Sequence, residues 1–230
     1  QRLRRFLADA SHELRTPLTS IRGYAELFRR GASTRPDDLA KAMARIEEES
    51  ARMGILVDDL LLLARLDQGR PLEREPVDLT SLVSEGVEAA RAVEPDRPID
   101  VVLDETLTVN GDALRLRQVV DNLLANVRTH TSRLTGARVI LERSGRDAVL
   151  EVVDHGPGLP EEGRDRIFNR FFRADPSRSR DRGGSGLGLA IVHAIVTAHG
   201  GTITALNTVP TGATFRITLP IEGGERVDAA

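Results

Sequence analysis

Apolar side chains recur every three or four positions along the N-terminal part of the chain. This spacing predicts an amphipathic helix from the N-terminus to about Arg30, ended by the turn-forming residues from Gly31 to Pro36. A second helix is predicted from Asp37 onward, because its apolar and small residues alternate in steps of four and three. The stripe of the first helix comprises Leu7, Leu14, Leu18, Ile21, Ala25 and Phe28, and that of the second comprises Leu39, Met43, Ile46, Ser50, Met53, Val57, Leu60 and Ala64.

Two adjacent helices of this kind form a hairpin. A hairpin by itself buries too little apolar surface to be stable, so we expect two copies to pair as a homodimer through a four-helix bundle. The alternative is an intramolecular coiled-coil arm that packs on the rest of the chain.

The pattern changes after residue 68. Residues 69–76 combine prolines, a glycine and charges without an apolar period, which is typical of a linker. Helical and alternating patterns then mix, so the fold class is α+β and multidomain, with a helical domain at residues 1–68, a second domain at 77–222 and a C-terminal tail at 223–230. Helices are expected at Leu79–Ala92, Asp112–Val127 and Gly188–His199, and strands at Ile99–Leu103, Leu107–Val109, Ala137–Glu142, Ala148–Val153, Thr202–Asn207 and Ala213–Leu219.

Composition narrows the class of protein. The 230 residues are 40% hydrophobic and 29% charged, enough for one or two domains with real cores. A net charge of −3 and a pI near 6.0 argue against a nucleic-acid partner. The absence of cysteine excludes disulfides and fits a reducing compartment. No apolar run reaches the length of a membrane span and no signal peptide is visible.

The first helix carries a histidine, His12, that lies off the apolar stripe. It comes two residues before Leu14, which is a rotation of roughly 200° toward solvent. Glu13 could hold one ring nitrogen as its N–H and leave the other with a free lone pair, as a nucleophile requires. Thr16 shares the face of His12 one turn later. Pro17 removes a helical N–H, so a bend or loosened turn is expected beside the histidine.

Two glycine motifs follow in the second domain. Asp154, Gly156 and Gly158 come directly after an expected strand, where a carboxylate could accept a hydrogen bond from a nucleobase amino group. The motif from Gly183 to Gly188 opens an apolar helix, whose first N–H groups favour phosphate. It is neither a Walker A loop nor a Rossmann fingerprint. An ordinary turn remains the alternative for the first motif.

Asn122 and Asn126 stand one turn apart on an expected helix, so their amides share one face. Amide oxygens suit Mg²⁺ that bridges nucleotide phosphates, while a pair of surface asparagines is the alternative. Between the glycine motifs, arginines and phenylalanines predict a mobile lid over phosphates, or else a solvated loop. His193 and His199 are expected to be helix-surface or capping residues, and no histidine shows metal-ligand spacing.

Taken in order, Ser11–Leu18, Asn122 with Asn126, Asp154–Gly158, the phenylalanine-rich segment and Gly184–Gly188 resemble the H, N, G1, F and G2 boxes of two-component sensor histidine kinases. The resemblance covers essentially the whole chain. It implies a dimerisation and phosphoacceptor four-helix bundle followed by an α/β-sandwich ATP-binding domain of the GHKL type, using ATP and Mg²⁺.

The resemblance also implies roles for individual residues. His12 is similar to the phosphoacceptor, Glu13 to its general base and Thr16 to the polar residue tied to phosphatase activity. Asn122 is similar to a catalytic asparagine on the phosphate side, and Asn126 to the Mg²⁺ ligand. The residues similar to the rest of the ATP site are His130, Asp154, Gly156, Gly158, Arg173, Gly184, Gly186, Leu187 and Gly188.

One position departs from the family. The family has lysine or arginine three residues after the second asparagine, where this chain has Thr129, while Arg128 comes one position early. A step of one residue is a rotation of roughly 100° on a helix. Either the helix ends there, or a phosphate contact is missing or comes from the lid.

The resemblance implies that His12 is phosphorylated from ATP and that the phosphoryl group passes to an aspartate of a response regulator receiver domain. Two other functions remain open: an ATP-binding dimeric scaffold or phosphatase-dominant homologue, and a non-kinase GHKL ATPase. The first helix is already under way at Gln1, so we expect a sensor region before it and a cytoplasmic location for this portion of a bacterial inner-membrane sensor.

Overall fold

The computed structural model describes residues 2–29, 36–69, 72–104, 106–161, 164–173 and 185–221. The chain divides between Arg65 and Leu66 into two compact units.

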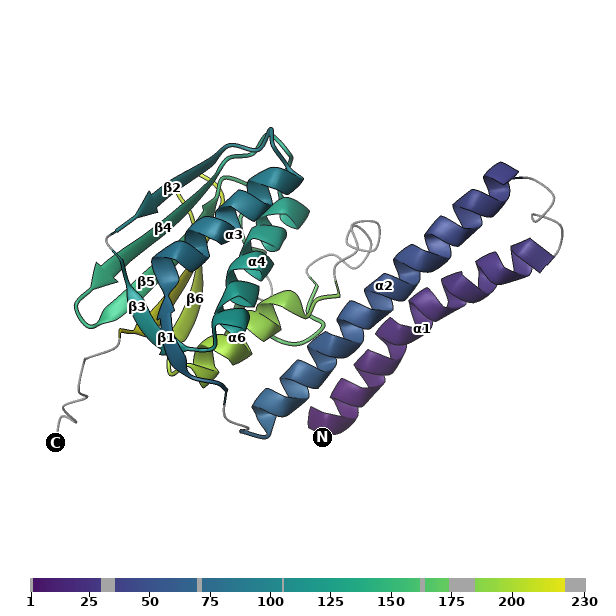
Figure 1. The fold of residues 1–230 in the computed structure, drawn as a ribbon, viewed down its shortest axis with the longest axis horizontal. Helices are drawn as coiled ribbons and strands as arrows, with labels where there is room; N and C mark the ends of the chain where they lie inside the picture. Colours follow the sequence, from purple (N-terminus) through teal and green to yellow (C-terminus); the bar gives the residue numbers. More distant parts are fainter. Residues whose placement is uncertain are drawn as a thin grey trace. The chain divides into compact units, whose positions relative to one another are not determined.

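The first unit is a hairpin of two long helices (Figure 1). Helix α1 spans Arg2–Arg29 and helix α2 spans Pro36–Asp67, so both predicted helices are confirmed to within a residue or two. Two aspartates, Asp37 and Asp38, occupy the first turn of α2, where negative charge complements the helix dipole. Helix α1 continues through Pro17, whose side chain is buried.

The apolar stripes of this unit are only partly covered. In α1 the predicted positions Leu14 and Ile21 are half-buried, but Leu18 is 55% exposed. In α2 the predicted positions alternate between half-buried and exposed, as Met53 and Val57 show. The predicted stripes are therefore only partly covered in the single chain, because each apolar face is wider than the one neighbouring helix can cover.

The second unit is a two-layer α/β sandwich (Figure 1). Its five-stranded mixed sheet has the order β2-β4-β5-β7-β6, with β2 parallel to β4 and all other pairs antiparallel. Three helices, α3, α4 and α6, lie against one face of the sheet. A separate two-stranded sheet pairs β1 with β3. The strands are β1 (Glu75–Asp78), β2 (Ile99–Leu103), β3 (Thr108–Gly111), β4 (Ala137–Ser144), β5 (Asp147–Asp154), β6 (Thr202–Asn207) and β7 (Ala213–Pro220), and the helices are α3 (Leu79–Val93), α4 (Ala113–His130) and α6 (Gly188–Ala198).

Simple sequence rules explain most of these elements. The hairpin of β4 and β5 closes over Ser144 and Asp147, with Gly145 in the left-handed conformation at φ +64°. Strand β7 alternates between buried and outward-facing residues, as expected for a sheet with one covered face. Helices α3 and α4 begin at aspartate caps, where Asp78 accepts from Ser81 N and Asp112 accepts from Arg115 N, each at 3.1 Å.

Two boundaries differ from expectation. Strand β1 begins at Glu75, within the expected linker, and was not predicted because only Val77 on it is buried and Pro76 argues against a strand. Helix α4 continues to His130, three residues past its expected end at Val127. No helix among the described residues is long and apolar enough to cross a membrane.

Candidate functional site

His12 is exposed on α1, as its rotation from the apolar stripe predicts. Thr16 is also exposed, and its hydroxyl lies 3.5 Å from the carbonyl oxygen of His12, a long contact that leaves the hydroxyl available for other partners. Glu13 is half-buried, and within the described part of the chain no hydrogen bond joins its carboxylate to the His12 ring. The exposure of His12 follows from its position on α1. The orientation of its ring by Glu13 stays a prediction.

Asp154 lies at the end of β5, in the interior of the second unit, and is only 5% exposed. One carboxylate oxygen, Oδ1, accepts hydrogen bonds from Gly156 N at 2.8 Å and Ala213 N at 3.3 Å. The other oxygen, Oδ2, takes no hydrogen bond from any residue that the structure describes. The carboxylate is thus fixed by two backbone donors and keeps one oxygen for an amino group of a ligand.

Glycines allow the backbone to approach this carboxylate closely. A Cβ on Gly156 would lie 2.6 Å from Cγ2 of Thr131 and 2.9 Å from Oδ1 of Asp154. Gly212 has φ +124°, and a Cβ there would overlap the carbonyl oxygen of Asp154. Gly158, at φ +85°, would meet the side chain of Asn207. Space therefore requires glycine at Gly156 and Gly212, and the positive φ of Gly158 and Gly212 also favours glycine there.

The second glycine motif lies at the start of α6 and is bonded to two other predicted motifs. The carbonyl oxygen of Gly186 accepts from Phe171 N at 2.9 Å, which attaches the phenylalanine segment. The carbonyl oxygen of Gly188 accepts from Nδ2 of Asn122 at 3.4 Å, which attaches α4. Leu187, between the two glycines, is fully buried. The predicted residue Gly184 lies outside the described residues.

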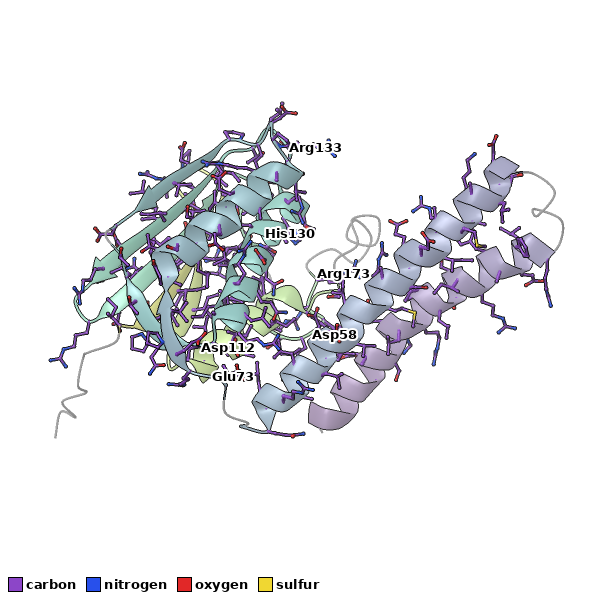
Figure 2. All side chains as sticks on the ribbon, viewed as in Figure 1. Asp58, Glu73, Asp112, His130, Arg133 and Arg173 are labelled. Atoms are coloured by element: carbon purple, nitrogen blue, oxygen red, sulfur yellow. The ribbon has the colours of Figure 1, made fainter. Side chains whose placement is uncertain are left out.

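The two asparagines are half-buried on α4, one turn apart. His130 is exposed at the end of that helix (Figure 2). Asn126 takes no hydrogen bond from the described residues, so its amide is available to a ligand. Across the described residues, no group of three or more histidine, cysteine, aspartate or glutamate side chains could hold a metal ion. A metal here would therefore depend on amide oxygens together with oxygens of a bound ligand.

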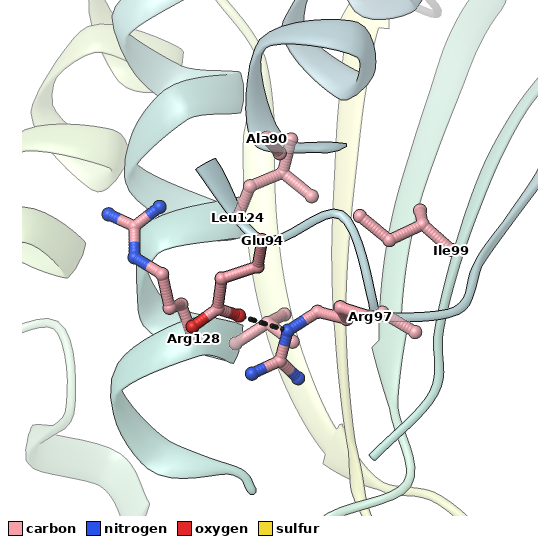
Figure 3. A pocket seen from close by; sticks show the side chains of 8 residues that line it. Ala90, Glu94, Arg97, Ile99, Leu124 and Arg128 are labelled. Atoms are coloured by element: carbon pink, nitrogen blue, oxygen red, sulfur yellow. Dashed lines mark hydrogen bonds and ion pairs between the residues drawn. The ribbon is translucent and has the colours of Figure 1, made fainter. Parts of the chain in front are cut away.

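The unusual positions Thr129 and Arg128 are both helical, so the idea that the helix ends before them is wrong. Thr129 bonds back to the carbonyl oxygen of Ala125 at 2.8 Å. Arg128 lines a small pocket on the α3 side of α4 together with Glu94 and Arg97 (Figure 3). It lies about 200° around the helix from Asn126, so it does not replace the missing basic residue on the asparagine face.

Only part of the expected lid is described. Residues 164–173 contain a short 3₁₀ turn, η2 (Arg164–Arg166), and two ring contacts. The guanidinium of Arg166 lies 5.3 Å from the centre of the Phe172 ring, and the Phe168 ring lies 5.8 Å from that of His193 on α6. The predicted residue Arg173 is half-buried in this segment. Residues 174–184, with the remaining arginines of the lid, lie outside the described residues.

Several residues of the site escaped sequence reasoning. Thr131, Asn207 and Gly212 lie in none of the predicted motifs. Gly212 and Asn207 reach the site through the pairing of β7 with β5 and with β6, where Val153 lies opposite Thr214 and Asn207 opposite Ala213. Thr131 reaches it from the end of α4, where it meets Gly156. His199 caps the C-terminus of α6, which was one of the two expected positions, but it is only 3% exposed and also bridges α6 to the start of α4. His193 is exposed, as expected.

Comparison with known proteins accounts for both units. Family models match the His Kinase A (phospho-acceptor) domain at residues 2–69 and the histidine kinase-, DNA gyrase B- and HSP90-like ATPase at residues 111–223. The probable sensor histidine kinase TcrY of Mycobacterium tuberculosis is 48% identical over 229 residues, which are 99% of this chain and 48% of TcrY. The chain thus spans about half the length of this relative.

Solved structures agree. The mycobacterial sensor histidine kinase MprB is 33% identical with a TM-score of 0.57, over 64% of this chain and 97% of that structure. Histidine kinase ThkA, solved in complex with the response regulator protein TrrA, is 26% identical with a TM-score of 0.72, over 93% of this chain and 60% of that one. The expected α+β architecture, with a helical phosphoacceptor region and a GHKL-type ATPase fold, is confirmed. The chain belongs to the two-component sensor histidine kinases.

Proposed function

We propose that this chain phosphorylates its own His12 from ATP and then passes the phosphoryl group to an aspartate of a response regulator. One observation carries the nucleotide half of this proposal. Within one unit, Asn122 is bonded to Gly188 at the start of α6, and Asp154 is held by Gly156 N and closely approached by Gly212, although these residues come from distant parts of the sequence. An exposed histidine in a helix that matches the phosphoacceptor family carries the other half.

The residues present fit adenine at one end of this site. Asp154 offers Oδ2 as an acceptor for an exocyclic amino group, while Oδ1 is held by Gly156 N and Ala213 N. Guanine carries a carbonyl oxygen at the corresponding position, and a carboxylate oxygen would repel it. The site therefore favours ATP over GTP.

The residues at the start of α6 fit phosphate. The helix opens at Gly188 without any acidic residue in its first turn, so its N–H groups and dipole face no competing side-chain charge there. Gly184, Gly186 and Arg173 would lie along this phosphate end. We propose that Asn126 ligates Mg²⁺ together with the phosphates and that Asn122 and His130 lie beside them. Mg²⁺ would supply charge neutralisation during the transfer.

In the proposed reaction a ring nitrogen of His12 attacks the γ-phosphorus with its lone pair. The N–P bond forms as the bond to the leaving oxygen of ADP breaks, and Glu13 holds the proton of the other ring nitrogen. Thr16, one turn along the exposed face, would orient the water that removes the phosphoryl group in a phosphatase reaction. Most of the catalysis then consists of positioning the two reactants in line.

We propose a homodimer built on the helical unit. Large apolar side chains on both helices are exposed in the single chain, which is the surface that a four-helix bundle would bury. They include Leu18, Leu27, Met43, Val57 and Leu61. The structure of ThkA with a response regulator supports a receiver domain as the second partner. The division at Arg65 supports proposed domains at 1–68 and 77–222, with a linker at 69–76 and a tail at 223–230.

Incubation of the chain with ATP labelled on the γ-phosphate tests the proposal. We expect label that is stable to base, labile to acid, and absent from His12→Gln. Arg22→Gln, an exposed position on the same helix, is the matched control and should keep the label. Label that persists in His12→Gln would contradict the proposal. ATP hydrolysis without label would indicate a non-kinase ATPase, and binding without either reaction a scaffold.

A further inference from the structure

Helices α4 and α6 are antiparallel neighbours joined by hydrogen bonds at two places. At one, Nδ2 of Asn122 donates to the carbonyl oxygen of Gly188 at the start of α6. At the other, Nε2 of His199 accepts from the backbone N–H of Asp112, directly before α4 begins, at 3.0 Å. Figure 2 shows Asp112 at the end of α4 opposite to His130.

The spacing of the two bonds matches along both helices. Asp112 and Asn122 are separated by ten residues, and Gly188 and His199 by eleven. At 1.5 Å per residue these are spans of about 15 and 16.5 Å. Because the spans are nearly equal, the bond at His199 and the bond at Asn122 hold together only in one sliding register of the helices. A slide of one residue at His199 would carry Asn122 away from the glycine motif.

The His199 ring is held in one neutral tautomer. Its Nδ1–H donates to the carbonyl oxygen of Ile195 at 2.8 Å, so Nε2 is left as the acceptor for the N–H of Asp112. A protonated ring would carry a hydrogen on Nε2 as well, so Nε2 could no longer accept from the N–H of Asp112 and this bond would be lost. Gly111 gives the ring its room, since a Cβ there would lie 2.6 Å from Cδ2 and 2.8 Å from Nε2 of His199.

Two charged residues face the ring. Arg74, on the segment before β1, donates to the carbonyl oxygen of Ala198 at 2.7 Å, and Asp112 caps α4. Burial lowers the pKa of His199 below its ordinary value of 6.5, and Arg74 lowers it further, against the hydrogen bond to Ile195 and the charge of Asp112, which raise it. The ring is therefore neutral at pH 7 and gains a proton only in acid.

We propose that His199, in its neutral form, is a positioning residue that sets the register of α4 against α6 and so keeps Asn122 at the phosphate end of the nucleotide site. His199 does not touch the nucleotide; it acts through the two helices. This role rests on the proposed function, since it assumes that the site binds ATP.

The test compares three forms of the whole chain for affinity toward a fluorescent ATP analogue between pH 8 and pH 5.5. In His199→Gln the amide oxygen takes the place of Nε2 as acceptor and does not titrate. In His199→Leu the acceptor is lost at every pH. We expect His199→Gln to bind like wild type at pH 8, and His199→Leu to bind about five- to tenfold more weakly, the effect of one lost hydrogen bond.

Acidification should separate the wild type from His199→Gln in affinity. As the pH falls through the lowered pKa of His199, the wild type should lose affinity relative to His199→Gln, while the titration of the analogue's own phosphates cancels in the ratio. Val196→Ala controls for a general loss of stability, because this fully buried residue of α6 contributes no side chain to either bond. It should melt at a lower temperature and keep its affinity.

A measurement made without nucleotide distinguishes a change at Asn122 from a variant that does not fold. The side-chain amide signals of Asn122 in an NMR spectrum should shift with pH in the wild type and stay constant in His199→Gln. Equal pH dependence of these two forms over a range in which the His199 ring gains its proton, or wild-type affinity in His199→Leu, would overturn the proposal. If the wild type fails to bind the analogue at pH 8, the proposed function fails instead, and the Asn122 signals alone then decide the role of His199.

Discussion

The two units place their reactive groups in different ways. In the helical unit, His12 is exposed because of its position on one helix, and nothing from a distant part of the described chain bonds to its ring. In the α/β unit, Asp154 is fixed by one backbone donor two residues along the chain and one from β7, and glycines around it leave no room for a side chain. In the proposed function His12 meets two different active sites and benefits from exposure, whereas the proposed nucleotide site has to be assembled in advance.

The largest effect that separates the units should come from Gly212→Ala. The new Cβ would overlap the carbonyl oxygen of Asp154, and φ +124° strains any residue other than glycine. We expect a loss of about 3 kcal/mol or more in the free energy of unfolding of the α/β unit, together with loss of nucleotide binding. Urea unfolding and binding of an ATP analogue measure the two effects.

Gly145→Ala is the matched control for this change. Gly145 also has a positive φ, +64°, but a Cβ there would meet nothing within 4 Å. It should cost only about 1 kcal/mol and leave the affinity intact. Equal losses in the two variants would mean that backbone strain, and not the close approach to Asp154, makes Gly212 necessary.

In the helical unit, Val57→Glu should weaken self-association of the chain and leave nucleotide binding unchanged. Val57→Glu removes an apolar side chain that is 40% exposed in the single chain and that the bundle would bury. Because two valines are lost per dimer, at about 1.5 kcal/mol each, we expect self-association to weaken roughly a hundredfold. Sedimentation equilibrium measures the dissociation constant.

Ile55→Glu is the control for this change, because Ile55 is 65% exposed but lies about 200° around the helix from Val57. It should leave the dissociation constant near its wild-type value. If both variants dimerise as strongly as the wild type, the bundle is not the dimer interface, and the exposed apolar side chains of the helical unit do not serve self-association.

A smaller effect is expected from Asp154→Asn, which keeps an acceptor for Gly156 N but replaces the free carboxylate oxygen by an amino group. The affinity for ATP should fall roughly ten- to a hundredfold, because a hydrogen bond to a charged group contributes about 1.5–3 kcal/mol. Glu151→Gln, on the same strand and paired with Arg216 at 2.9 Å, is the control. An unchanged affinity in Asp154→Asn would place adenine elsewhere.

The same difference between the units explains what the sequence could predict. The order of helices and strands follows from local patterns, and His12 could be placed because its exposure depends on one helix. Asp154, Asn122 and the glycines were predicted because their motifs are local. Thr131 and Asn207 were not predicted, because their places depend on the packing of the end of α4 against Gly156 and on the pairing of β6 with β7. The bridge from His199 to Asp112 was not predicted either, because it depends on the packing of α4 against α6. Strand β1 was missed because only one of its residues is buried.

The two units should also respond to acid in opposite directions. Asp59, in α2, has its pKa raised to about 6, mainly by burial and further by the charge of Asp58. Its folded form binds a proton more readily than the unfolded chain, so the helical unit should gain stability as the pH falls from about 6 toward 3.8. His199 has a lowered pKa, so the α/β unit should lose stability as the pH falls below 6.5.

Calorimetry of the whole chain between pH 7.5 and pH 4.5 measures both transitions, and two variants assign them. Asp59→Asn should stabilise the helical unit by about 1 kcal/mol at pH 7, a figure reduced for the partial exposure of the side chain, and by much less at pH 4.5, where the wild-type carboxyl is already neutral. His199→Gln should flatten only the transition of the α/β unit. Parallel shifts of both transitions would show that the units unfold as one, because two independent units with opposite titrating groups must separate as the pH falls.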